Sequence, residues 1–109
     1  MSSEKNQNQK IQEMQFLEQN LQNLMLQKQA FQMELSETIE AANEINHSPD
    51  EVFKIVGQLM IQTNKTKMID ELKNKEKILD LRIKSIEKQE DSLTKQVEKI
   101  RGEVIKSAK

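Results

Sequence analysis

Residues 52–62 decide the fold of this chain, and they read Val52-Phe53-Lys54-Ile55-Val56-Gly57-Gln58-Leu59-Met60-Ile61-Gln62. β-Branched and apolar side chains dominate the stretch, and a glycine stands at its centre. This pattern predicts two short strands joined by a tight turn. Because an isolated strand pair is barely stable in water, one with open edges and this many apolar residues is expected to pair with strands of other subunits.

Long stretches on both sides of this segment carry apolar residues at alternating spacings of three and four. The first stripe is apolar at eight of ten positions and the second at nine of eleven. The positions are Met14, Leu17, Leu21, Leu24, Lys28, Phe31, Leu35, Thr38, Ala42 and Ile45, then Ile69, Leu72, Glu76, Leu79, Ile83, Ile86, Glu90, Leu93, Val97, Ile100 and Val104. Such a repeat makes one narrow seam, which a helix buries against another helix. The sequence therefore predicts a mainly α fold, a long antiparallel two-helix coiled-coil hairpin with a short β-hairpin at the bend.

Local signals set the expected boundaries of these elements. Pro49 ends the first helix because the residue before a proline avoids the α region. Either Asn64 or Thr66 can cap the second helix. Residues 1–9 are polar and are expected to be frayed or disordered. The expected elements are a first helix over about 9–46, a β-hairpin over about 51–63 and a second helix over about 65–106, in a single domain of residues 1–109.

The two seams also predict a register. Aligning their hairpin-side ends pairs positions whose numbers sum to about 114–118, as for paired antiparallel helices. Leu21 is then expected near Leu93 and Val97. The same register brings two polar seam positions, Lys28 and Glu90, within reach of each other, and a buried polar pair of this kind helps to select one register.

Composition excludes several classes of function. The formal net charge of −1 gives no field that would attract nucleic acid or an anionic membrane. No apolar run is long enough to cross a bilayer and no signal peptide is visible, so a cytoplasmic location is expected. Cysteine is absent, His47 stands alone, and Gly57 and Gly102 form no phosphate-binding loop. We therefore expect no catalytic, cofactor or metal site, and no enzyme.

Residues 52–62 resemble the central motif of the beta-class prefoldin subunits. The stretch Leu79-Asp80-Leu81-Arg82-Ile83-Lys84-Ser85-Ile86-Glu87-Lys88-Gln89-Glu90 is similar to the second-helix motif of archaeal prefoldin beta. Two departures are Phe53, where Tyr is common, and Gln58, where Pro or a small residue is frequent. The resemblance implies a hetero-hexameric chaperone, in which two alpha and four beta subunits join their strands into a β-barrel platform. It also implies that the coiled-coil tips hold unfolded proteins without ATP and deliver them to a group II chaperonin.

Two sets of residues are candidates for these roles. The oligomerisation residues are Val52, Phe53, Ile55, Val56, Leu59 and Ile61. The client-binding residues, near both chain ends, are Ile11, Met14, Phe16, Leu17, Val97, Ile100, Val104 and Ile105. Several of these also belong to the seam, so the tip has to fray to offer them. An alternative function is a structural adaptor subunit that does not bind unfolded proteins.

Overall fold

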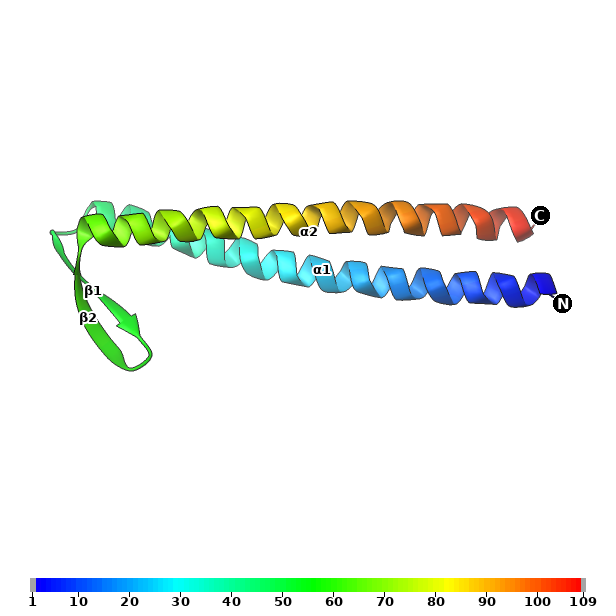
Figure 1. Ribbon diagram of the computed structural model, residues 1–109, viewed down its shortest axis with the longest axis horizontal. Coiled ribbons are helices and arrows are strands. Elements are labelled where there is room, and N and C mark those ends of the chain that lie inside the picture. Colours follow the sequence, from blue (N-terminus) through cyan, green and yellow to red (C-terminus); the bar gives the residue numbers. More distant parts are fainter. Residues whose placement is uncertain (1, 109) are drawn as a thin grey trace. The chain divides into compact units, whose positions relative to one another are not determined.

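The computed structural model describes residues 2–108, with side chains described from Glu4 to Ser107. Helix α1 spans Ser2–Asn46 and helix α2 spans Lys65–Ala108. Between them in the sequence lie strands β1, Glu51–Val56, and β2, Leu59–Asn64, which form one antiparallel sheet (Figure 1). The predicted fold class, two long helices with a strand pair between them, is confirmed.

Helix α1 begins at Ser2, so the expectation that residues 1–9 are frayed or disordered was wrong for residues 2–9. Residue 1 lies outside the described residues. Gln7 and Lys10 continue the spacing of the seam toward the N-terminus, and both are half-buried. Lys10 also forms an ion pair of 3.5 Å with Glu103. Because extending an existing helix is far easier than starting one, these weak contacts are enough to carry α1 to its first residues.

The chain divides into two compact units. Residues 1–29 with residues 84–109 form the terminal unit, and residues 30–83 form the hairpin unit. In the terminal unit, Glu18 lies 3.3 Å from Arg101 while Lys10 pairs with Glu103. Rising numbers in α1 thus meet falling numbers in α2, so the two helix segments run antiparallel.

The hairpin unit has the same arrangement. Glu34 lies 3.2 Å from Lys75, and the guanidinium of Arg82 stacks over the ring of Phe31 at 5.7 Å from its centroid. Here too the α1 and α2 segments are antiparallel.

The core of each unit follows the predicted seam, since every seam position in both stripes is buried or half-buried. In the terminal unit, Leu17, Val97 and Ile100 form a buried cluster, and Met14, Leu21, Leu93 and Val104 pack against it. Leu21, Leu93 and Val97 therefore belong to one packed group, as the predicted register requires. In the hairpin unit the buried side chains are Thr38, Ala42, Leu72, Leu79 and Ile83.

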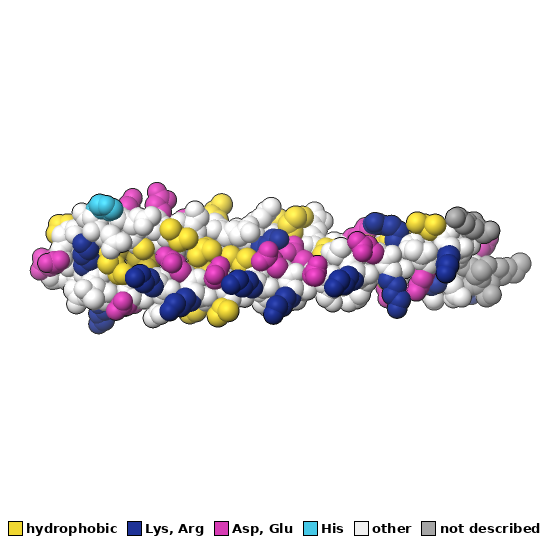
Figure 2. All heavy atoms as spheres, turned by 90° about the horizontal axis from the view of Figure 1, so that it is seen from above, with side chains coloured by type: hydrophobic (Ala, Val, Ile, Leu, Met, Phe, Trp, Pro, Cys, Tyr) yellow, Lys and Arg dark blue, Asp and Glu magenta, His cyan; other side chains and the backbone are white. Residues whose placement is uncertain are grey.

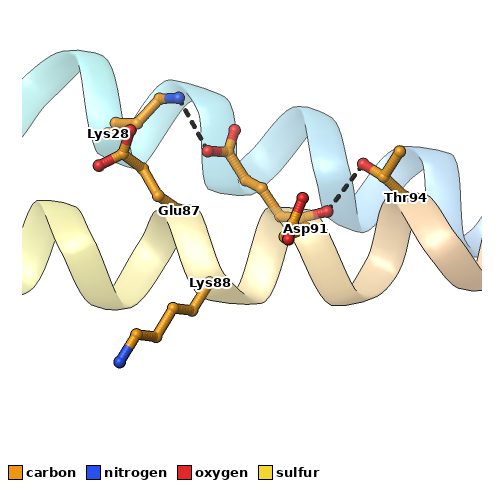
Figure 3. A pocket seen from close by; sticks show the side chains of 6 residues that line it. Lys28, Glu87, Lys88, Asp91 and Thr94 are labelled. Carbon is orange, nitrogen blue, oxygen red and sulfur yellow. Dashed lines mark hydrogen bonds and ion pairs between the residues drawn. The ribbon is translucent and has the colours of Figure 1, made fainter.

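One ion pair interrupts the apolar seam of the terminal unit. Lys28 Nζ reaches from α1 to Glu90 Oε1 on α2 at 2.8 Å, which confirms the predicted pair (Figure 3). The hydrogen bond to Glu90 raises the pKa of Lys28, while burial acts in the opposite direction. A shallow groove beside the pair is lined by Lys28, Glu87, Lys88, Glu90, Asp91 and Thr94.

Candidate functional site: the exposed hairpin and the helix ends

The hairpin turns through two residues. Val56 pairs with Leu59, so Gly57 and Gln58 form the loop. Gly57 has a φ of 61° and Gln58 has no positive φ. A positive φ at the first loop position alone defines a type II′ turn, whose twist matches that of the strands and which favours glycine there. The turn sets the register of the strand pair and therefore which side chains share a face.

One face of the hairpin is exposed along its whole length. This outer face consists of Glu51, Phe53, Ile55, Met60, Gln62 and Asn64. Its apolar centre is the cross-strand pair of Ile55, 73% exposed, and Met60, 69% exposed, with Phe53 beside it. At the base, Gln62 Nε2 donates a 2.6 Å hydrogen bond to Glu51 Oε1. An apolar centre with a polar margin is the usual composition of a surface that a partner covers.

The other face is covered at its base only. This inner face consists of Val52, Lys54, Val56, Leu59, Ile61 and Thr63. Val52, Lys54 and Thr63, near the base, are half-buried, whereas the residues toward the turn are exposed. Lys54 Nζ lies 3.4 Å from both carboxylate oxygens of Glu71, on α2. The base of the inner face is therefore held at α2, and the outer face remains free in this chain.

The predicted oligomerisation residues fall on both faces. Phe53, Ile55, Val56, Leu59 and Ile61 are exposed, as an interface residue has to be in a single chain. Val52 is half-buried on the inner face. Met60 was not among the predicted residues, although it is among the most exposed apolar side chains of the hairpin. The two-residue turn contains the missing signal, because it places Met60 opposite Ile55.

Most of the predicted client-binding residues are already packed within the chain. Leu17, Val97 and Ile100 form the buried cluster, and Met14 and Val104 pack against it. Ile11 is half-buried. Only Phe16, 62% exposed, and Ile105, 55% exposed, are open to solvent. Two of the eight predicted client-binding residues are thus exposed as the chain stands, and the other six become accessible only if the helix pair opens.

Charged side chains of both signs make up much of the remaining surface of the described residues. On the face drawn in Figure 2, basic and acidic side chains are interleaved rather than gathered into a patch of one sign. His47 lies at the end of α1 with Nδ1 2.8 Å from the Asn43 carbonyl oxygen, a local contact at the helix terminus. Among the described residues, no group of three or more His, Cys, Asp or Glu side chains could hold a metal ion. No described helix is long and apolar enough to cross a membrane.

These features define a class of protein, a two-helix subunit with an exposed apolar strand pair between its helices in the sequence. The sequence profile described as "Prefoldin subunit" matches residues 8–109 of the chain. The chain belongs to the prefoldin family, which is a family of chaperones and not of enzymes.

Individual relatives agree with this assignment. The chain is 36% identical over 88 residues to prefoldin subunit beta of Pyrobaculum calidifontis, covering 79% of this chain and 70% of that protein. It is 37% identical over 89 residues to prefoldin subunit beta of Thermococcus kodakarensis, covering 80% and 76%. The crystal structure of the prefoldin beta subunit from Thermococcus strain KS-1 superposes with a TM-score of 0.85 at 33% identity, covering 91% of this chain and 89% of that one. The chain has the role of a prefoldin chaperone subunit.

Proposed function

We propose that this chain is an ATP-independent holdase subunit that assembles with alpha-class and further beta-class prefoldin subunits through its hairpin. The observation that carries the proposal is the outer face, where Phe53, Ile55 and Met60 lie exposed on a strand pair with open edges. Burying such side chains against a partner is strongly favourable, and strand edges supply directional hydrogen bonds for the pairing.

The complex has two alpha and four beta subunits, and this chain acts in it as one domain over residues 1–109. It works in the cytoplasm and catalyses no reaction. Several arms acting together hold one unfolded chain through many weak contacts, which gives avidity without sequence specificity. Release then passes the client to a group II chaperonin.

Client capture uses the apolar side chains near both chain ends. Phe16 and Ile105 make the first contacts because both are exposed. Ile11, Met14, Leu17, Val97, Ile100 and Val104 follow when the end of the helix pair frays, a local opening that requires little free energy at a helix terminus. The support for this step is the position of these residues near the two helix ends, in the terminal unit.

The test compares two matched double variants in the complex with an alpha-class subunit. Phe16→Gln with Ile105→Gln removes the exposed apolar pair and leaves the seam intact. Met25→Gln with Leu26→Gln removes two exposed apolar side chains of the same unit, farther from the chain ends. Suppression of aggregation of a chemically denatured test protein is measured at equal complex concentration. We expect the first variant to lose most of the protection and the second to keep it.

Two other outcomes would contradict the proposal. Full protection by the Phe16 and Ile105 variant, with loss in the Met25 and Leu26 variant, would place the client surface along the middle of α1. No protection by the wild-type complex would favour a structural adaptor subunit.

A further inference from the structure

The first residue of α2 breaks a rule of helix electrostatics. Lys65 places a positive charge at the helix N-terminus, where the macrodipole disfavours cations, and the first turn of α2 contains no acidic residue to offset it. Asn64 already caps this end, since its Oδ1 accepts a 2.7 Å hydrogen bond from the Lys67 backbone N–H. Lys65 is therefore in a position that helix stability alone does not explain.

The ammonium group of Lys65 forms hydrogen bonds at the end of the other helix, α1. Lys65 Nζ donates to the carbonyl oxygens of Asn46 at 2.7 Å and Ser48 at 3.3 Å. Asn46 is the last residue of α1, where free carbonyls and the negative end of the dipole attract a cation. The backbone N–H of Lys65 also donates to the Asp50 carbonyl oxygen at 3.0 Å. One residue thus joins the end of α1, the entry to β1 and the start of α2.

The carbonyl groups just before Asn46 are satisfied locally, which leaves the last one for Lys65. The backbone N–H groups of His47 and Ser48 donate to Glu44 at 3.1 Å and to Ile45 at 3.0 Å. Ser48 Oγ donates to the Glu44 carbonyl oxygen as well, at 2.9 Å. The Asn46 carbonyl receives its hydrogen bond from across the base of the hairpin, so Lys65 clamps that base.

A second contact holds the hairpin farther along. Lys54, on the inner face of β1, reaches both oxygens of Glu71 on α2 at 3.4 Å. Because this ion pair is partly exposed, its contribution to stability is modest. Both contacts lie within the hairpin unit. The Lys65 ammonium ties residues 46 and 48 to the start of α2, and the Lys54–Glu71 pair ties β1 to α2, so together they hold the base of the strand pair.

We propose that Lys65 is a positioning residue for subunit assembly, with the Lys54–Glu71 pair as its support. The inference rests on the proposed assembly through the hairpin. Pairing between subunits requires strand edges and the outer face to meet a partner in one orientation, and holding that orientation before contact removes an entropic penalty from association. None of these three side chains belongs to the outer face, so all three act through the orientation of the hairpin.

The main test is Lys65→Met, with Lys67→Met as the matched control. Both variants remove one charge from the first turn of α2, but among the described residues the Lys67 side chain forms no hydrogen bond or ion pair. Sedimentation velocity gives the subunit dissociation constant, with and without an alpha-class subunit. Losing a charge-assisted hydrogen bond predicts about tenfold weaker assembly for Lys65→Met and no change for Lys67→Met. Lys65→Arg, which retains donors to both carbonyls, is expected to restore assembly.

A second measurement distinguishes a positioning role of Lys65 from a purely structural one. Circular dichroism of diluted, dissociated chain gives the helix content and the melting temperature. Positioning predicts that Lys65→Met keeps the helix content, changes the melting temperature little and weakens assembly. If weaker assembly is fully accounted for by a lower melting temperature of the dissociated chain, or if assembly is unchanged, the proposal is wrong.

Should Lys65→Met lose helix content, a charge-exchange series still tests whether holding the strand pair at α2 strengthens assembly. Lys54→Glu and Glu71→Lys are each expected to weaken assembly by about two- to threefold, as for a partly exposed ion pair. The double variant is expected to regain wild-type assembly, and failure of both single variants to weaken it would refute the supporting contact. Wild-type chain that forms no oligomer under any of these conditions would instead overturn the proposed function itself.

Discussion

Ile55→Lys tests the central claim that the outer face of the hairpin is an assembly surface. Ile55 is 73% exposed in the single chain, so most of its side chain remains to be buried in a complex. Full burial of an isoleucine is worth about 1.5–3 kcal/mol, so this share corresponds to about 1–2 kcal/mol per subunit. Lysine forfeits that contribution and adds the penalty of covering a charge without a partner.

The same substitution is expected to leave the single chain nearly unchanged. A side chain that is open to solvent contributes little to folding, and substitutions at such positions usually change stability by less than about 0.5 kcal/mol. Helix content and melting temperature of the dissociated chain are therefore expected to match the wild type, while the mass in solution falls from oligomer to free subunit.

Leu81→Lys is the matched control, because Leu81 is 67% exposed and lies on α2 rather than in the hairpin. Sedimentation velocity at several concentrations is the assay for all three proteins. An Ile55→Lys chain with the wild-type mass and dissociation constant would refute the reasoning. Equal dissociation by Leu81→Lys would show that exposure alone, not the position in the hairpin, decides the outcome.

Leu79→Ala removes a side chain that is only 2% exposed in the seam, and we expect it to destabilise the chain by about 2–4 kcal/mol in urea unfolding. Leu81→Ala, two positions along the same helix, is expected to change stability by less than about 0.5 kcal/mol. Lys28→Leu alone should lower the melting temperature by leaving Glu90 half-buried without its partner, whereas the double Leu variant should be at least as stable as wild type; a less stable double variant with unchanged register would contradict this. Because the pKa of Lys28 is raised in the folded chain, its stabilisation is present below the ordinary lysine pKa and is lost as pH rises through the raised value, so the wild type should lose stability relative to the double Leu variant at strongly alkaline pH. Gly57→Ala forces a side chain into a left-handed conformation and should destabilise the hairpin by about 1–2 kcal/mol, seen as faster amide exchange in both strands.

Features with a short repeat were predictable from the sequence. Every position that the spacing of the apolar residues assigned to the seam is buried or half-buried, because burial on a helix depends on a periodicity that the chain carries locally. Aligning the hairpin-side ends of the two seams led to the Lys28–Glu90 pair, whose charged atoms lie 2.8 Å apart. The strands and their turn followed from the apolar run around Gly57 in the same way.

Features that depend on neighbours far along the chain were not predictable in this way. The start of α1 was placed too late because Gln7 and Lys10 are polar, and only the antiparallel partner makes them part of the seam. Met60 was overlooked because the face of a strand residue depends on cross-strand register.

The sequence by itself determined the helical seams, their pairing and the strand pair between them, since each follows from apolar residues spaced two, three or four positions apart. Tertiary structure alone decided which face of the hairpin is free and what Lys65 does. From the sequence, a basic residue at the start of a helix is only electrostatically unfavourable. In the structure, the last carbonyl group of α1 lies at its ammonium group and accounts for the charge. The reason is physical, because periodicity is local while the partner of a charge or of a strand face is set by the path of the whole chain.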